Sequence, residues 1–498
     1  MIDRKSIPTE GEDKEALLEQ MRGFGADDPD WDRGRTWSLV YYAGEEHYDF
    51  LKEAHNLYFS ANGLNPMAFQ SLKRMESEVV DMTGQMLNGD DEVVGTMTSG
   101  GTESIMMAVK AARDRAKKKR LWSRNPNIVA PETIHVAFDK AAHYFGLEVR
   151  RAPTDDDFRA DVDAMRDLVD RNTRLIAASA PQYPHGMVDP IPEIGQIARE
   201  KQLPFHVDAC FGGFMLPWLE KLGYELPEWD FRVPGVTSIS ADVHKYGYAA
   251  KGASVVCYRN MDYLKHQFFV ATGWPGGIYA SPTMQGTRPG GAIAAAWASL
   301  MALGEDGFVE LARETMEAKE QLKSGVEEID DLEVLGSEHA TVVTWRSSHP
   351  DIDTYAIADQ MEGRGWSLDR QQNPACVHCT VSAGNRPVVD DFLADLAESV
   401  EVVRERPELK SEGNAAMYGL MAKIPLEGAV KMSILKVMEQ MYAPGGGSDS
   451  LDLSKVGSGD DDSPLLKLVN EYGDLAMELL ERVDDLRDVI GQFLPGRR

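Results

Sequence analysis

Short β-rich runs alternate with helical stretches through the middle of the chain, between about residues 95 and 300. In the helical stretches, such as 105–118 and 161–171, apolar residues recur at close to helical spacing. Alternation of this kind predicts an α/β domain built on a largely parallel sheet. The runs that we predict to be strands are 93–97, 127–130, 175–178, 205–207 and 254–258.

The two flanks of this region have different patterns. Residues 8–24 form a polar amphipathic helical pattern, and 45–88 is again helical, with Leu72, Met75 and Val79 near helical spacing. Beyond about residue 310, a long helix leads to further helices and strands, which predicts a smaller α+β domain. The strands predicted there are 332–334, 341–345 and 377–381.

The composition changes again near the end of the chain. Residues 443–464 are rich in Gly, Ser and Asp, as is typical of a flexible linker. An apolar stripe from Leu465 to Ile490 then predicts an amphipathic helix, whose acidic polar face favours packing on protein rather than on membrane. The predicted segments are therefore a mostly helical 1–90, a large α/β domain over 91–310, an α+β domain over 311–442, a linker over 443–464 and a helix over 465–494.

Charge and apolar content limit the partners. The chain of 498 residues is 43% hydrophobic, which is ample for a buried core, and carries a net charge of −29. A field of that sign opposes nucleic acid and anionic membrane, so we exclude both as partners. The apolar run 292–303 is too short to cross a bilayer, and the polar N-terminus has no secretory signal. We therefore expect a cytoplasmic protein without a membrane span.

The four cysteines also fit a reducing compartment, because they are too few for a disulfide framework in a chain of this length. Cys376 and Cys379 form a C-x-x-C pair within a predicted strand. Residues three apart on a strand point to opposite faces, which suits neither a metal nor a disulfide. We therefore predict no metal site.

The candidate chemistry centres on Lys245, in the run Asp-Val-His-Lys-Tyr over 242–246. A lysine in this setting could hold pyridoxal phosphate as a Schiff base, although a lone lysine also fits a surface turn. Upstream, Ser-Gly-Gly-Thr-Glu-Ser over 99–104 follows a predicted strand and opens a predicted helix. Paired glycines let the backbone approach an anion, and the first-turn amides and the Thr102 hydroxyl can donate to it.

Two side chains between these motifs strengthen the hypothesis. Asp208 stands at the carboxyl end of a predicted strand, where it could pair with a protonated pyridine nitrogen and keep the cofactor an electron sink. His135 could stack on the cofactor ring. An Asp at a sheet end and a His in a core are each ordinary alone. Their order along the chain, glycine-rich turn, His, Asp, His-Lys, predicts a pyridoxal phosphate enzyme.

Together with Gly-Ile-Tyr-Ala-Ser-Pro-Thr over 277–283, these motifs resemble the sphingosine-1-phosphate lyase family, within the group II pyridoxal phosphate-dependent decarboxylases, from about residue 35 to 440. The resemblance implies a type I pyridoxal phosphate-dependent transferase fold, as in aspartate aminotransferase, and a homodimer with shared active sites. It implies that the catalytic residues are Lys245, Tyr183 and His135. The implied cofactor-binding residues are Gly100, Gly101, Thr102, His135, Asp208, Asp242, His244 and Lys245, with Thr287 from the partner subunit.

The resemblance also implies a second polar site, for the phosphate of the substrate, formed by Tyr42, Asn62, Asn65 and Lys251. The family usually reads Asn-Pro-Leu-His-Pro where residues 62–66 here read Asn-Gly-Leu-Asn-Pro. Asn65 can still hydrogen-bond a phosphate oxygen, but it brings no charge.

The implied reaction is retro-aldol cleavage of the Cα–Cβ bond of a phosphorylated sphingoid base, which releases a fatty aldehyde and phosphoethanolamine. Lys245, Tyr183 and a phosphate oxygen of the cofactor are all candidates for the acid/base group. A group II amino-acid decarboxylase is the main alternative, and it needs no distal phosphate site, so Lys251 favours the lyase. A non-catalytic scaffold is the other, and the joint presence of Lys245, Asp208 and His135 argues against it.

Overall fold

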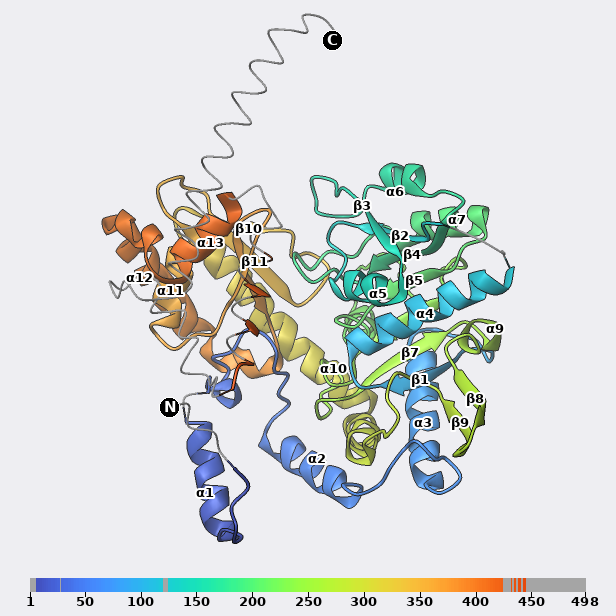
Figure 1. Ribbon diagram of the computed structural model, residues 1–498. Coiled ribbons are helices and arrows are strands. Elements are labelled where there is room, and N and C mark those ends of the chain that lie inside the picture. The colour runs from blue at the N-terminus through green and yellow to red at the C-terminus, as the bar shows by residue number, and fades with distance from the viewer. Residues whose placement is uncertain are drawn as a thin grey trace, which may run out of the picture.

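The strands of the central sheet of the computed structural model lie in the order β1-β7-β6-β5-β4-β2-β3 (Figure 1). β7 runs antiparallel to both of its neighbours, and the remaining pairs are parallel. The bounds are β1 (Val94–Thr98), β2 (Asn127–Pro131), β3 (Glu148–Ala152), β4 (Thr173–Ser179), β5 (Phe205–Asp208), β6 (Ser238–Ala241) and β7 (Ser254–Tyr258). The structure describes residues 6–26, 28–119 and 124–423, with positions 431, 434, 435, 438, 439 and 442–444 beyond them.

Helices cover both faces of this sheet. Side chains alternate along each strand, so Leu175 and Ala177 of β4 pack on one face while Ile176 and Ala178 pack on the other. Every residue of β4 is buried, as expected for a parallel strand covered on both faces. The first face is covered by α4 (Gly101–Lys119), α5 (Ala137–Phe145) and α9 (Met261–Leu264), and the second by α3 (Gln70–Met86), α6 (Val162–Leu168), α7 (Ile191–Lys201) and α8 (Leu216–Lys221).

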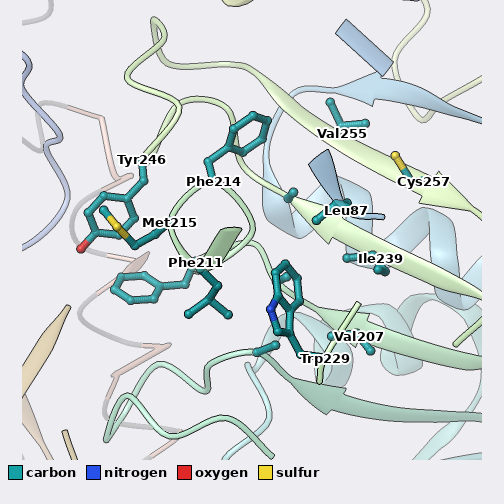
Figure 2. Close-up of a cluster of buried hydrophobic side chains, with 14 of the residues drawn as sticks. Leu87, Val207, Phe211, Phe214, Met215, Trp229, Ile239, Tyr246, Val255 and Cys257 are labelled. Carbon is teal, nitrogen blue, oxygen red and sulfur yellow. The ribbon is translucent and has the colours of Figure 1, made fainter. Parts of the chain in front are cut away.

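The core on the second face extends to the residue next to Lys245. Figure 2 shows part of it, from Cys257 on β7 through Ile239 and Trp229 to Tyr246. Tyr246 is fully buried, and its hydroxyl donates to the carbonyl oxygen of Val381 at 2.6 Å. The backbone around Lys245 is therefore fixed by packing and by a hydrogen bond to the smaller domain.

The smaller domain is built on an antiparallel sheet in the order β10-β11-β13-β12. Its core includes Trp345, Trp366 and Phe392, and Trp37 from the N-terminal region packs into it. The elements are β10 (Leu332–Leu335), β11 (Val342–Ser347), α11 (Thr354–Glu362), β12 (Asp369–Gln371), β13 (Cys376–Thr380), η2 (Ala383–Val388), α12 (Val389–Glu405), η3 (Pro407–Ser411) and α13 (Gly413–Lys423).

A long helix, α10 (Gly290–Glu327), joins the two sheets. It starts about twenty residues earlier than the sequence pattern predicts, and it is kinked at Gly304, where φ is 57°. Its length and hydropathy would allow it to cross a membrane, but half of its most apolar window is buried in the protein. It packs on α2 (Glu45–Leu57), α3, α8, α12 and β10, which accounts for its apolar character.

The N-terminal region contributes α1 (Lys14–Phe24), the 3-10 turn η1 (Trp31–Arg33), α2 and α3. The helical pattern over 45–88 is therefore two helices, because 58–69 form turns between them. The strands β8 (Phe269–Trp274) and β9 (Gly277–Ser281) form a separate hairpin beside the central sheet.

The predicted strands are all present, and the type I fold with its mainly parallel sheet is confirmed. The boundaries drawn between domains stay predictions. The predicted helix 465–494 lies outside the described residues, as does the linker 443–464 apart from its first two positions. Cys376 and Cys379 lie on β13, and all four cysteines are buried and free. Among the described residues, no group of His, Cys, Asp and Glu side chains is placed to hold a metal ion.

Candidate active site

A cavity of about 630 Å³ lies at the carboxyl ends of the parallel strands. This edge is where open α/β sheets bind ligands, because the loops that leave successive strands meet there. Five of these loops contribute, those that follow β1, β2, β4, β5 and β6. The residues of the cavity wall used below are Tyr41, Ser99, Gly100, Gly101, Thr102, His135, Tyr183, Asp208, Cys210, Asp242, His244, Lys245 and Lys251.

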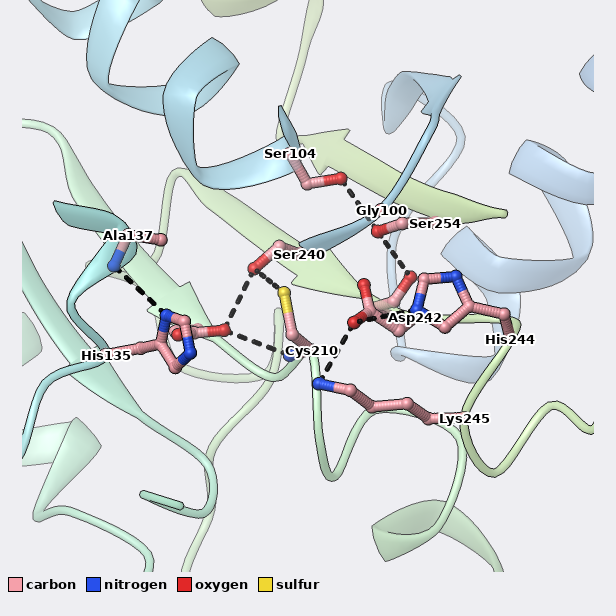
Figure 3. A network of polar contacts seen from close by, with 12 residues as sticks. Gly100, Ser104, His135, Ala137, Cys210, Ser240, Asp242, His244, Lys245 and Ser254 are labelled. Atoms are coloured by element: carbon pink, nitrogen blue, oxygen red, sulfur yellow. Dashed lines mark hydrogen bonds and ion pairs between the residues drawn. The ribbon is translucent and has the colours of Figure 1, made fainter. Parts of the chain in front are cut away.

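Lys245 follows β6 and is paired with a carboxylate. Its Nζ lies 3.0 Å from Oδ2 of Asp242, which is 2% exposed (Figure 3). Burial alone would lower the pKa of Lys245, but Asp242 and, more weakly, Tyr41 outweigh burial and raise that pKa above its ordinary value. The same pairing lowers the pKa of Asp242 against the effect of its own burial. The amine and its partner are therefore an ion pair within the cavity wall.

The glycine-rich turn approaches this pair closely. A Cβ atom on Gly101 would stand 2.7 Å from Oδ2 of Asp242 and 2.8 Å from Sγ of Cys210. The first turn of α4 can lie this close to the lysine loop because residue 101 has no side chain. The helix N-terminus brings its free amides to the cavity at Gly101 and Thr102, where an anion would be stabilised.

His244 lies beside this cradle, with its Nε2 3.7 Å from Oδ2 of Asp242 and its Nδ1 accepting from the amide of Ala253 at 3.2 Å. Burial is the main cause that lowers the pKa of His244, and Lys251 and Lys245 lower it further. The imidazole is therefore neutral near neutral pH, with Nε2 carrying its proton as a donor.

Asp208 ends β5 and is held by a hydrogen-bond network beneath the cavity. Its Oδ1 accepts from the amide of Cys210 at 3.1 Å and from the hydroxyl of Ser240 at 3.3 Å. Behind it, Nε2 of His206 lies 3.1 Å from the Ser240 hydroxyl, and burial lowers the pKa of His206 to about 4. Both hydrogen bonds to the carboxylate of Asp208 within the described chain fall on Oδ1, so Oδ2 can accept from a proton donor in the cavity.

His135 stands across the cavity from Lys245 (Figure 3). Its Nδ1 accepts from the amide of Ala137 at 3.1 Å, which fixes the orientation of the ring. An oriented aromatic ring, a carboxylate at a strand end, a lysine amine and a glycine-lined helix N-terminus thus surround one cavity. Each matches one part of pyridoxal phosphate, namely its ring face, its pyridine nitrogen, its aldehyde carbon and its phosphate. The site therefore fits this cofactor.

Lys251 lies on the wall between this cavity and a second one of about 590 Å³, which also shares Tyr41. Its Nζ donates to the carbonyl oxygens of Leu39 at 2.7 Å and His244 at 3.2 Å, and lies 5.2 Å from the centre of the Tyr41 ring. Burial of the ammonium lowers the pKa of Lys251 to about 8, and repulsion from Lys245 adds to this. Tyr42 lines the second cavity.

The other residues predicted for phosphate lie elsewhere in the same protomer. Asn62 Nδ2 donates to the hydroxyl of Thr287 at 3.3 Å, and Asn62 Oδ1 accepts from the amide of Leu64 at 2.9 Å. Asn65 Oδ1 accepts from the amide of Met67 at 3.1 Å, which leaves its amide nitrogen as the donor. Asn62, Asn65 and Thr287 do not line the cavity of Lys245 within the described chain.

Tyr183 reaches the cavity from the loop after β4. Its hydroxyl donates to Oδ2 of Asp369 at 2.6 Å, and its ring lies on that of His378, with centroids 4.2 Å apart. Asp369 and His378 belong to β12 and β13, so the smaller domain contacts the site through this tyrosine.

Known proteins match this arrangement over most of the chain. Residues 49–348 match the family described as the pyridoxal-dependent decarboxylase conserved domain. Sphingosine-1-phosphate lyase of Arabidopsis thaliana is 45% identical over 434 residues, which cover 86% of this chain and 79% of the plant protein. The chain belongs to the sphingosine-1-phosphate lyase family. The resemblance carried by the sequence motifs is therefore confirmed, and this family member is a pyridoxal phosphate-dependent lyase.

Solved structures agree with this assignment. A sphingosine-1-phosphate lyase of Burkholderia pseudomallei K96243 matches this lyase with a TM-score of 0.77 and 40% identity, over 82% of this chain and 94% of that chain. Glutamate decarboxylase of Lactobacillus brevis matches with a TM-score of 0.71 at 21% identity, over 80% and 95% of the two chains. The second likeness shows the shared fold alone.

Sequence reasoning missed several side chains of this lyase that contact the site. Tyr41 lies in the irregular segment between η1 and α2, and Asp369 comes from an edge strand of three residues in the smaller domain. Cys210 stands two positions after Asp208, and its thiol lies 3.1 Å from the Ser240 hydroxyl. Position next to a strand-end Asp could have indicated Cys210, but nothing local to Tyr41 or Asp369 indicates the site.

Proposed function

We propose that this lyase cleaves the Cα–Cβ bond of sphingosine 1-phosphate to a fatty aldehyde and phosphoethanolamine. The observation that carries the proposal is Lys251, a cation on the wall of the same cavity as the cofactor-binding lysine. The protein as a whole has a net charge of −29 and repels an anionic substrate, so a phosphate needs a local positive group. Lys251 supplies one, and a phosphate beside it would raise its pKa and keep it charged.

The residues divide the work of this reaction. Lys245 would hold pyridoxal phosphate, Asp208 would accept a hydrogen bond from its pyridine nitrogen, and Gly101, Thr102 and His244 would bind its phosphate. When bound, pyridoxal phosphate draws the electrons of the broken Cα–Cβ bond into its ring. Lys251, with Tyr42, binds the distal phosphate and so fixes which substrate bond faces the reacting centre.

The substrate assignment is tested with Lys251→Met, which removes the ammonium and keeps an unbranched side chain. Loss of a charge-assisted hydrogen bond of about 1.5–3 kcal/mol should lower kcat/KM for sphingosine 1-phosphate by roughly 10- to 150-fold. Activity on the unphosphorylated amino alcohol should change little. Lys52→Met is the matched control, because Lys52 lines the second cavity but pairs with Asp49 at 2.8 Å. Equal losses for both substrates would mean that Lys251 binds no phosphate.

The reaction products distinguish the lyase from the alternative, an amino-acid decarboxylase. Wild-type holoenzyme is incubated with sphingosine 1-phosphate and, separately, with a panel of amino acids. Aldehyde from the first and no carbon dioxide from the second is the expected result. Carbon dioxide release from an amino acid, without aldehyde release from the phosphorylated substrate, would contradict the proposed lyase activity and favour decarboxylation.

We also propose a homodimer whose sites are shared. Asn62 and Thr287 contact each other away from the Lys245 cavity, which supports a role in the partner's site. The β8–β9 hairpin exposes Val270, Trp274 and Ile278, an apolar surface suited to a second copy. Mixing Lys245→Ala with Thr287→Ala protomers should restore activity, because one site of each hybrid dimer is then intact. No restoration in proven hybrids would contradict sharing through Thr287.

The cytoplasm remains our proposal for its location, supported by the four buried free cysteines. Cell fractionation followed by immunoblotting tests it, and recovery with membranes or outside the cell would contradict it.

A further inference from the structure

Tyr183 is held on its loop by the smaller domain. The carbonyl oxygen of the next residue, Pro184, accepts from the Thr344 hydroxyl at 2.7 Å and lies 3.3 Å from Nδ1 of His378. Gly186 adopts φ of 69°, and a Cβ there would lie 2.8 Å from Cβ of Val342, so the loop packs directly against β11. The Tyr183 ring therefore has a fixed position between the two sheets.

The hydroxyl of Tyr183 has one proton, and its direction is set by Asp369. The 2.6 Å hydrogen bond to Oδ2 of Asp369 takes that proton, so Tyr183 Oη can meet a ligand only as an acceptor, with the lone pair that the Thr380 hydroxyl leaves. Burial raises the pKa of Tyr183 well above its ordinary value, and the charge of Asp369 raises it further. Tyr41, whose pKa is also raised by burial, and His378, whose pKa burial lowers to about 4, are the other titratable groups beside it.

This geometry limits which part of the substrate Tyr183 can contact. A phosphate dianion has no proton to donate, and it is repelled by the carboxylate behind the tyrosine. The β-hydroxyl of a phosphorylated amino alcohol does have a proton to donate. Tyr183 therefore suits the hydroxyl, and Lys251, the cation that lines the same cavity, suits the phosphate.

Resting on the proposed function, we propose that Asp369 is a positioning residue that makes Tyr183 the acceptor of the β-hydroxyl proton. The substrate O–H and Cα–Cβ bonds break and the aldehyde C=O bond forms, while the electron pair of the Cα–Cβ bond stays with Cα. The hydroxyl proton moves to Tyr183 Oη as the tyrosine proton moves to Asp369 Oδ2. Cα later takes up one proton by way of the same pair, so that both side chains end in their starting state.

Kinetics of Asp369→Asn, Tyr183→Phe and the double variant test this relay. Each single variant should lower kcat by roughly 10²- to 10⁴-fold, the range of general acid–base catalysis, with KM changed far less. Because Asp369 acts through Tyr183, the double variant should be no slower than Tyr183→Phe. Asp369→Glu should restore part of the rate. Wild-type kcat in Asp369→Asn, or multiplied losses in the double variant, would overturn the proposal.

Glu362→Gln is the matched control for damage to the smaller domain. Glu362 binds Arg370, the neighbour of Asp369, at 2.6 Å but does not contact Tyr183. It should leave kcat within about twofold of wild type. A loss of kcat in Glu362→Gln equal to that in Asp369→Asn would reduce the role of Asp369 to folding and overturn the proposal.

A second measurement is independent of turnover. 3-Fluorotyrosine is placed at position 183 of the holoenzyme, and its ionisation is followed by fluorine NMR. Asp369→Asn should lower the pKa of this residue, because it removes the carboxylate that holds the proton. A pKa unchanged by Asp369→Asn overturns the proposal. If Asp369→Asn does not fold, the pKa of the 3-fluorotyrosine at position 183 is measured in the otherwise wild-type holoenzyme. An ordinary pKa for that residue would then overturn the proposal. Failure of wild-type enzyme to cleave sphingosine 1-phosphate would instead refute the proposed function and leave the titration result standing.

Discussion

Replacing Arg288 with methionine should destabilise this lyase strongly, because the change leaves a carboxylate buried without its cation. Arg288 Nη2 lies 2.6 Å from Oε1 of Glu76, and Nη1 lies 3.1 Å from Oε2. Both side chains are 6% exposed, and Nη2 also donates to the carbonyl oxygen of Met97 at 3.0 Å. The pair therefore ties α3 to β1 and to the start of α10.

The size of the effect follows from this burial. Breaking one side of a buried ion pair costs about 3–5 kcal/mol, which is several times the value of an exposed pair. The unfolding entropy for 498 residues is on the order of 1 kcal/mol per K. The expected fall in Tm is therefore about 3–5 °C. Lys73, whose Nζ lies 3.8 Å from Glu76 Oε2, compensates only in part because it is largely exposed.

Urea unfolding followed by tryptophan fluorescence, together with calorimetry, measures this loss. Arg74→Met is the matched control. Arg74 lies on α3, the helix of Glu76, and pairs with Glu78 at 2.7 Å, but its side chain is 80% exposed. Arg74→Met should lose about 0.5 kcal/mol or less. Replacing Glu76 and Arg288 together with methionine should recover much of the stability, since no charge then stays buried. If Arg288→Met loses no more than Arg74→Met, the reasoning from burial is wrong.

The same pair gives a dependence on pH with a defined sign. Burial raises the pKa of Glu76, but Arg288 outweighs burial and holds that pKa below its ordinary value of 4.5. A carboxyl group whose pKa is depressed by folding stabilises the protein above its unfolded pKa and loses that contribution as pH falls through the folded pKa. Wild type should therefore lose stability below about pH 4.5. The difference in unfolding free energy between wild type and Arg288→Met should become smaller over the same pH range. The reason is that the unpaired Glu76 of the variant is already protonated at a higher pH.

Two further predictions concern the site. Because the pKa of Lys251 is about 8, the ammonium that we propose for phosphate binding should be lost as pH rises through that value, so kcat/KM for the phosphorylated substrate should fall about tenfold per pH unit above it. The pH dependence of kcat/KM measures this fall, and Lys251→Met should not show it. If the fall above about pH 8 persists in Lys251→Met, another group causes it. Gly101→Ala places a Cβ 2.7 Å from Asp242 and should weaken cofactor binding, measured by titration with pyridoxal phosphate, and cost about 1–3 kcal/mol of stability. Gly23→Ala, which meets nothing within 4 Å, is its control, and equal effects would show that close packing at residue 101 is unimportant.

The sequence predicts the part of the site that depends on single strand ends. Asp208, His135 and the glycine-rich turn each follow a recognisable β-rich run, and the ends of parallel strands meet at one edge. Two strands of the sheet were missed for physical reasons. β3 reads Glu-Val-Arg-Arg-Ala and lies at the sheet edge, while β6 has four residues, two of them serine.

The residues that the sequence does not predict come from other parts of the chain. Asp369 meets Tyr183 across 186 positions, and that contact exists because β12 packs beside the loop after β4. Neither the hydrophobic periodicity nor the turn residues near Tyr183 or Asp369 could predict a contact between residues so far apart in the sequence. The early start of α10 has a similar origin, because a helix that contributes to two cores keeps its apolar pattern across both.

The charged groups of the cavity are arranged to orient a substrate that is cationic at one end and anionic at the other. Asp369 lies behind Tyr183, whereas Lys251 lies on the wall that faces the second cavity. The ammonium of Lys251 attracts a phosphate, whereas the carboxylate of Asp369 repels it. Both effects therefore disfavour binding of the substrate in the reversed orientation. Lys245 cannot take the phosphate instead, because Asp242 neutralises it at 3.0 Å. In a chain with a net charge of −29, we therefore expect the selectivity for a phosphorylated amine to depend on the position of Lys251, which lacks a carboxylate partner among the described residues.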